Sequence, residues 1–112
     1  MSLAHASHGI DDVTYKIEFC TKCRYKIFRQ PRLAGRCEAA IRAVAERHLI
    51  IIIELSVMQE HVHCIVRAFS RYSLSYITPL LKGGSAYSMF REFPQLCLGY
   101  PRGSLWVLAK PA

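Results

Sequence analysis

The chain has 112 residues, of which 52% are hydrophobic, and 15 Lys and Arg against 8 Asp and Glu give it a net charge of +7. This length fits a single domain over residues 1–112, and the apolar content is sufficient for a core, which excludes an intrinsically disordered chain. No apolar run approaches the roughly 20 residues of a membrane span, and the first residues lack a signal-peptide pattern, so we expect a soluble cytoplasmic protein that does not contact a membrane.

The first predicted element is a half-buried strand over residues 13–20, where apolar and polar side chains alternate in VTYKIEFC. Its core-facing residues are Val13, Tyr15, Ile17 and Phe19. Cys20 at its end and Cys23 have the spacing of a zinc-finger pair. No second matching pair follows, so a chance pair is favoured over a zinc site.

A basic loop is predicted over residues 21–32. Six basic and no acidic side chains fall in this loop and just after it: Lys22, Arg24, Lys26, Arg29, Arg32 and Arg36. Such clustering is typical of a protein that binds a polyanion, most often nucleic acid, although a solvated basic surface is the alternative. We predict that Lys22, Arg24 and Lys26 bind nucleic acid.

An amphipathic helix is predicted from residue 32 to residue 48, with apolar positions at helical spacing and charges opposite. These positions are Leu33, Cys37, Ala40, Ile41, Val44, Ala45 and His48. The aliphatic run over residues 49–57 predicts a strand that is buried on both faces. A short turn leads to the next strand, over residues 61–68.

His61 and His63 lie two residues apart on that strand, so their side chains point to one face and Val62 and Cys64 to the other. We expect the valine and cysteine to pack under helices and the histidines to lie on the open face. Two neighbouring imidazoles are a natural pair of ligands for a divalent cation. Two unremarkable histidines on a half-exposed strand are the alternative, because most metal sites need more ligands.

Residues 73–93 are predicted to be mainly helical, with Leu74, Ile77, Leu80 and Leu81 on one stripe and interruptions at Pro79 and at residues 83–84. Lys82 on this helix is a candidate phosphate contact or a plain surface lysine. The Walker A pattern of a nucleotide site is missing. A loop and a last strand over residues 104–110 complete the chain.

The element order βαββαβ predicts the α+β, ferredoxin-like arrangement, an antiparallel sheet with two helices on one face. Many unrelated functions share this fold, and a metabolic enzyme of this class remains an alternative. Tyrosine is a candidate covalent nucleophile. The chain has six tyrosines, and none has an activating group beside it in the sequence.

Four segments together resemble the single-tyrosine HUH transposases, the small enzymes of insertion-sequence-200-type elements. They are YKIEFCTKCRYKIF (15–28), ELSVMQEHVHCIV (54–66), SLSYITPLLKGGSAYSMFREFP (73–94) and SLW (104–106). The match runs from about residue 13 to residue 106. The TK-x-R, VM-x-x-HVH and LKG-x-SA blocks, in this order and spacing, make it specific.

The resemblance implies a homodimer that carries out DNA transposition of an insertion sequence. It implies that His61 and His63 help to hold Mg²⁺ or Mn²⁺, which polarises a phosphate of single-stranded DNA while a tyrosine attacks. This chemistry requires no nucleotide cofactor. The DNA hairpins that such enzymes recognise would contact the basic loop and Lys82.

The chain departs from the family pattern at four places. The family commonly has His, Glu and Asp where this chain has Lys16, Ser56 and Glu60. We therefore expect weakened metal binding, with Glu54 or Glu60 as replacement ligands. The family's nucleophile lies on a helix after the last strand, and none of the tyrosines here has the matching place. The catalytic residue is thus unknown, and we expect a C-terminally truncated or degenerate member that does not nick DNA, or a non-catalytic DNA- or RNA-binding module.

Overall fold

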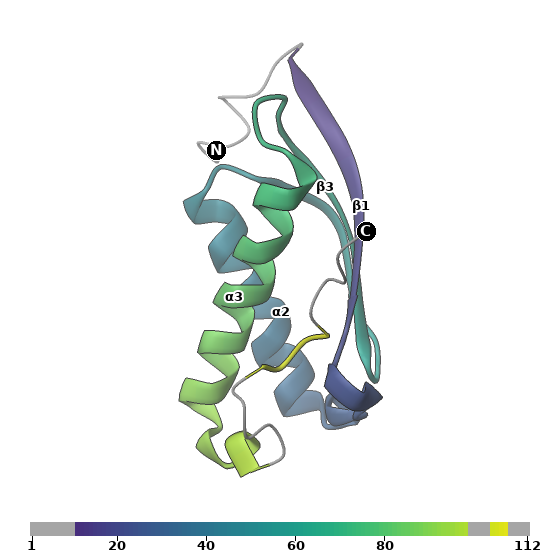
Figure 1. The fold of residues 1–112 in the computed structure, drawn as a ribbon, viewed down its shortest axis with the longest axis vertical. Coiled ribbons are helices and arrows are strands. Elements are labelled where there is room, and N and C mark those ends of the chain that lie inside the picture. The colour runs from purple at the N-terminus through teal and green to yellow at the C-terminus, as the bar shows by residue number, and fades with distance from the viewer. Residues whose placement is uncertain (1–10, 99–103, 108–112) are drawn as a thin grey trace.

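The computed structural model describes residues 11–98 and 104–107. Two long helices cover one face of a three-stranded antiparallel sheet (Figure 1). The elements in chain order are β1 (Asp12–Cys20), the short 3-10 helices η1 (Lys22–Arg24) and η2 (Ile27–Arg29), α2 (Pro31–Arg47), β2 (Ile51–Val57), β3 (His61–Phe69), α3 (Leu74–Glu92) and η3 (Pro94–Leu98). The predicted α+β, ferredoxin-like class is confirmed.

Strand β3 is the centre of the sheet, because the strand order is β1-β3-β2. It pairs with β1 along its whole length, from Asp12 opposite Phe69 to Cys20 opposite His61. The last predicted strand is seen only as one isolated bridge, between Thr21 and Trp106, and residues 108–110 lie outside the described residues. This bridge places the C-terminal part of the described chain beside the end of β1.

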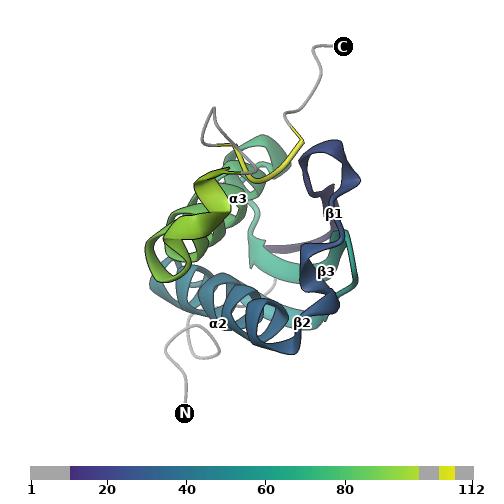
Figure 2. The same cartoon turned by 90° about the horizontal axis from the view of Figure 1, so that it is seen from below.

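The core lies between the sheet and the helices, which occupy the same side of the sheet (Figure 2). The β3 residues Val62, Cys64 and Val66 are fully buried there, as the alternation predicts. The predicted apolar face of α2 is also confirmed from Leu33 to Ala45, whereas His48 is only half-buried. Neither of the two long helices in the described ranges combines the length and apolar composition of a bilayer-crossing helix.

The predicted interruptions of α3 at Pro79 and at residues 83–84 are wrong, since the helix is continuous from Leu74 to Glu92. Pro79 removes one backbone donor in the second turn of the helix. Burial of every fourth residue outweighs this loss, and the buried residues are Ile77, Leu81, Ser85 and Met89. Leu74, which was predicted to lie on the apolar stripe, is 43% exposed.

The prediction that residues 49–57 form a strand buried on both faces is also wrong. Strand β2 begins at Ile51 and pairs only with β3, so it is an edge strand of the described sheet. Its register shifts between Ile52 and Glu54, as at a β-bulge, and Ile53 at this point is 50% exposed. The aliphatic run indicates a strand, but it does not say whether that strand is central or at an edge.

Candidate functional site

His61 and His63 lie on the sheet face that the helices do not cover. Both side chains are half-buried, while Val62 and Cys64 beside them are fully buried on the helix side. The predicted orientation of the pair is therefore confirmed. It follows from the period-two geometry of β3 and from the packing of α2 and α3 on the other face.

The pairing register places polar side chains from both neighbouring strands around the histidines. His63 lies between Glu18 of β1 and Ser56 of β2. The Oε1 atom of Glu54 is 3.8 Å from His63 Nε2. On the other histidine, Nδ1 of His61 is 3.1 Å from Oε1 of Glu60. Each imidazole thus has its own carboxylate neighbour.

These donors do not form a complete site for Mg²⁺ or Mn²⁺. Among the side chains that the structure describes, no three His, Cys, Asp or Glu residues converge in a way that could hold an ion. Ser56 lies opposite His63 and offers a neutral hydroxyl in place of the carboxylate oxygen that hard cations prefer. Lys16 is on the same open face, opposite Ile65, and adds a positive charge there. The arrangement therefore fits a divalent cation incompletely.

The basic loop is fixed beside His61 by Thr21, which is fully buried. The Thr21 N–H donates to the Glu60 carbonyl oxygen at 2.8 Å. The Thr21 hydroxyl donates to the Tyr25 carbonyl oxygen at 2.7 Å and lies 3.2 Å from that of Glu60. The N–H of Phe28 donates to the Gln59 carbonyl oxygen at 3.1 Å. The loop is thus bound at two points to the turn between β2 and β3.

The basic side chains of this loop reach solvent, whereas Thr21 and Phe28 are buried. Arg24 and Lys26 are exposed and Lys22 is half-exposed. Cys23 and Arg24 have positive φ values of 59° and 53°, a conformation that residues other than glycine rarely adopt. The three predicted nucleic-acid contacts and the histidine pair therefore lie at the same end of the sheet. Cys20 and Cys23 carry free thiols and belong to no metal cluster in the part of the chain that the structure describes.

Lys82 is placed differently from the loop residues. Its ammonium group donates to the Val107 carbonyl oxygen at 2.6 Å, and partial burial lowers its pKa. The N–H of Val107 in turn donates to the Cys20 carbonyl oxygen at 2.8 Å. Lys82 therefore connects α3 to the end of β1 through residues 104–107. Its phosphate contact stays a prediction.

Ser85 and Trp106 form a second connection that the sequence reasoning missed. The indole N–H of Trp106 donates to Ser85 Oγ at 3.0 Å, and the Ser85 hydroxyl donates to the Leu81 carbonyl oxygen at 2.7 Å. The Trp106 ring centroid is 4.6 Å from that of Phe19, in an edge-to-face arrangement. The LKG-x-SA and SLW blocks contain both residues, but their spacing gives no sign that they touch.

The described tyrosines lie mostly away from the histidines. The Tyr15 hydroxyl donates to the Tyr72 carbonyl oxygen at 2.8 Å, and the Tyr72 and Tyr76 rings are 5.0 Å apart, beyond the opposite end of β3. Tyr87 is on α3 and is 67% exposed. Tyr25 belongs to the basic loop, next to the turn that carries Glu60. Tyr100 lies outside the described residues.

Comparisons with known proteins show which family the chain resembles. The family model described as "Transposase IS200 like" matches residues 10–108. The ISDra2 transposase TnpA of Deinococcus radiodurans is 29% identical over 92 residues, which cover 82% of this chain and 65% of that protein. This chain thus spans less than two thirds of that relative's length.

A solved structure also resembles the fold. It is a crystal structure described as a "putative transposase" from Deinococcus radiodurans, with a TM-score of 0.80 and 26% sequence identity. The match covers 90% of this chain and 77% of that one. The family model spans nearly the whole chain, and the sheet, the helices and the histidine strand fall within it. The chain therefore belongs to the IS200-like transposase family.

Proposed function

We propose that the chain binds single-stranded or hairpin DNA from the ends of an insertion sequence, as a protein of DNA transposition. The observation that supports this most is the fixed position of the basic loop. Thr21 binds both the loop and the carbonyl of Glu60, so the cations of the loop lie next to the histidine face. Phosphates held by Lys22, Arg24 and Lys26 would bring the DNA backbone to His61.

We further propose that His61 and His63 bind Mg²⁺ or Mn²⁺ weakly. Glu54 and Glu60 are the replacement ligands, because each already lies next to one of the two imidazoles. A divalent ion held here supplies a Lewis acid for a phosphate oxygen. Weak affinity follows from the incomplete donor set and from Lys16 on the same face.

The DNA-binding proposal is tested by fluorescence anisotropy with a labelled DNA hairpin across a salt series. Binding that depends on phosphates weakens with salt, with a slope of about −0.9 per contact on the duplex stem of a hairpin. The triple variant Lys22→Ala, Arg24→Ala and Lys26→Ala should flatten this slope by about 2.7 and weaken binding. Arg42→Ala is the matched control, because Arg42 is on α2 and pairs with Glu38 at 3.2 Å. A triple variant with the wild-type slope would reject the loop as the contact.

A non-catalytic binding role is the second candidate, and the incomplete donor set favours it. We expect the 112-residue chain to form no covalent adduct with single-stranded DNA in the presence of Mn²⁺, as judged on a denaturing gel. An adduct would contradict this expectation. Its loss in Tyr25→Phe would then identify the nucleophile. Competition by a matched RNA hairpin in the anisotropy assay separates DNA binding from general RNA binding.

We also propose that the chain forms a homodimer through the outer edge of β2, which no described strand pairs. An exposed sheet edge offers backbone donors and acceptors to a second copy. Light scattering at micromolar concentration should give twice the mass of one chain. A monomer mass under these conditions would reject the proposal.

A further inference from the structure

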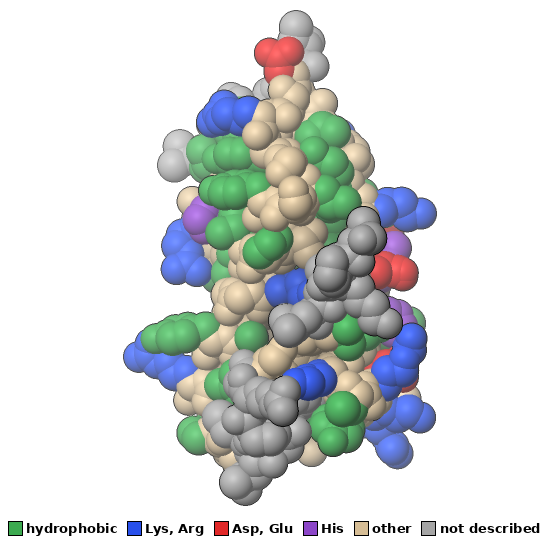
Figure 3. Space-filling model, viewed as in Figure 1, with side chains coloured by type: hydrophobic (Ala, Val, Ile, Leu, Met, Phe, Trp, Pro, Cys, Tyr) green, Lys and Arg blue, Asp and Glu red, His purple; other side chains and the backbone are tan. Residues whose placement is uncertain are grey.

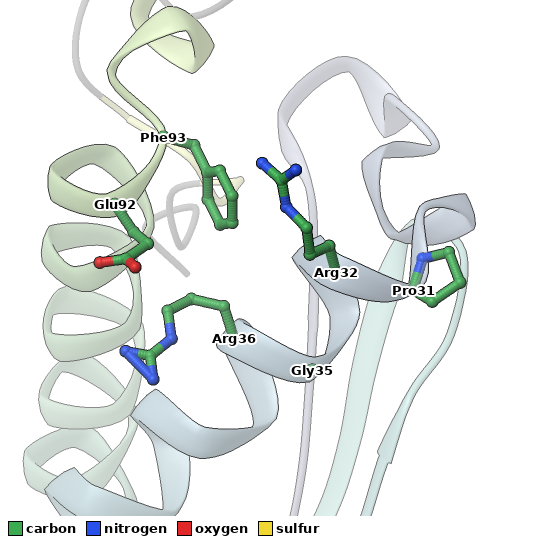
Figure 4. A pocket seen from close by; sticks show the side chains of 6 residues that line it. All are labelled: Pro31, Arg32, Gly35, Arg36, Glu92 and Phe93. Carbon is green, nitrogen blue, oxygen red and sulfur yellow. The ribbon is translucent and has the colours of Figure 1, made fainter.

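The helix layer carries a second cationic surface, in the groove between α2 and α3. Two clefts of about 480 and about 400 Å³ lie along this groove, and Arg36 and Glu92 line both of them. In the first cleft, Arg32 and Arg36 of α2 face Glu92 and Phe93 at the end of α3 (Figure 4). Arg47 and Arg91 line the second. The groove therefore carries more positive than negative charge.

The arginines of this groove have few internal partners. Among the described residues, Arg36, Arg47 and Arg91 form no ion pair, whereas Arg42 on another side of α2 pairs with Glu38. The guanidinium carbon of Arg32 lies 5.2 Å from the Phe93 ring centroid, a contact that holds its planar group at the mouth of the cleft. The groove thus presents several guanidinium groups whose donors are available to an anion.

The groove is continuous in sequence with the basic loop. Arg32 is the last residue of the loop and lies in the first turn of α2, and Arg36 is one helical turn further along the same side of this helix. From Arg32 to Arg47 the helix rises by roughly 22 Å. Lys and Arg side chains line both the helix-side edge and the sheet-side edge of the molecule (Figure 3). Along the chain, basic residues therefore continue from the loop at the histidine end of the sheet into the first turns of α2.

The groove lining suits an extended polynucleotide. Ala43 is small and exposed, so a phosphate backbone can approach α2 closely at this point. Tyr87 at the edge of the same cleft is 67% exposed, and its hydroxyl is 3.5 Å from Arg91 Nη1. Exposed aromatic rings beside arginines are a common platform for the bases of single-stranded nucleic acid.

We propose that the α2–α3 groove binds the phosphates of a single-stranded DNA segment that continues from the basic loop. This inference rests on the proposed DNA-binding function and adds a second contact surface to it. An acidic protein segment would also suit the charge. Continuity with the loop and the ring of Tyr87 favour DNA.

The test uses the full chain and a labelled oligodeoxythymidylate of about 20 nucleotides, longer than the site of one small domain. The double variant Arg36→Ala and Arg91→Ala should bind several-fold more weakly and lower the salt slope by about 1.4. Glu92→Gln should bind more tightly than wild type, because it removes the negative charge that lines both clefts. Arg42→Ala on the same helix should change neither quantity.

The outcomes separate this inference from the proposed function. If the double variant and Glu92→Gln both bind as Arg42→Ala does, while the loop triple variant loses affinity, the groove is rejected and the loop proposal stands. If wild type does not bind the oligonucleotide or the hairpin, both proposals fail. Weaker binding by the double variant counts for the groove only if its circular dichroism matches that of wild type. Tighter binding by Glu92→Gln supports the groove independently, since misfolding would not increase affinity.

Discussion

The hydroxyl of Ser56 lies opposite His63 on the open face of the sheet. A carboxylate at this position would join the two imidazoles as an oxygen donor, and oxygen donors dominate sites for hard cations. We predict that Ser56→Glu binds Mn²⁺ on the order of tenfold more tightly than wild type, as measured by isothermal titration calorimetry.

Thr14→Glu is the matched control for this prediction. Thr14 is exposed on the same face of the sheet but lies opposite Arg67, two pairs beyond Lys16 and away from the histidines. If Ser56→Glu and Thr14→Glu bind Mn²⁺ equally well, the His61–His63 pair is not the metal site.

At the scale of single residues, the orientation of the histidine pair could be predicted, because alternation along a strand fixes which face each side chain takes. The hydrogen bonds by which Thr21 fixes the basic loop and Lys82 connects α3 to residues 104–107 could not be predicted. Thr21 and Glu60 are separated by 39 positions, and Lys82 and Val107 by 25. A hydrogen bond from a side chain to a distant backbone carbonyl leaves no periodic pattern in the sequence. A lysine that donates to such a carbonyl therefore cannot be distinguished in the sequence from a lysine that faces solvent.

Helices α2 and α3 approach each other closely at Gly84. A Cβ atom added there would overlap Val44 Cγ2, whereas one added at the neighbouring Gly83 would meet nothing within 4 Å. We predict that Gly84→Ala lowers the free energy of unfolding by about 1–3 kcal/mol, the usual cost of overpacking. Urea denaturation followed by circular dichroism measures this change.

Gly83→Ala is the control, and it should raise stability by up to about 1 kcal/mol through helix propensity. A Gly84→Ala and Val44→Ala double variant should recover part of the lost stability, because the smaller side chain removes the overlap. Equal stability of Gly84→Ala and Gly83→Ala would show that the helices can separate at this point.

At the scale of elements, the type of each segment, helix or strand, could be predicted from the sequence. The position at which each segment packs could be predicted less well. Helix α3 is continuous because α2 and the sheet bury every fourth residue, a tertiary effect that outweighs Pro79. Strand β2 is at an edge although its sequence is as apolar as that of a central strand. Position within a sheet depends on which strands pair, and local composition does not determine pairing.

At the scale of the whole molecule, two of the described thiols, those of Cys37 and Cys64, are buried in the core, with consequences for stability at alkaline pH. Burial raises the pKa of Cys37 to about 12 and that of Cys64 to about 11, from an ordinary value of 9.0. A group whose pKa is raised on folding contributes stability fully below its unfolded pKa, and this contribution is lost as pH rises toward the folded pKa. We predict that the free energy of unfolding falls between about pH 9 and about pH 11. Each of the two thiols contributes a loss of up to roughly 1.4 kcal/mol per pH unit.

Urea denaturation at several pH values across this range measures the loss. Cys37→Ala combined with Cys64→Ala should give a shallower decline than wild type, even though the variant starts from lower stability. Parallel declines in the two proteins would mean that other groups, such as lysines and tyrosines, cause the alkaline loss.

At the scale of the whole fold, the element order and the α+β class followed from the sequence, because long periodic segments carry a strong signal. The cationic surface between α2 and α3 could not be predicted from the sequence. The charge pattern around residues 22–36 indicates a polyanion partner, but the groove also needs Arg47 and Arg91. Arg47 lies on the same helix as Arg36, but Arg91 comes next to Arg36 only when α2 and α3 pack.

Trp106 is the only tryptophan of the chain, and it contacts β1, η2 and α3 at once through Phe19, Phe28 and Ser85. Its fluorescence therefore reports on the junction where residues 104–107, the basic loop and the helix layer meet. A change in emission upon addition of DNA would register movement at this junction without an attached dye. The protein thus carries an intrinsic optical probe next to the end of β1, close to where its proposed ligand would bind.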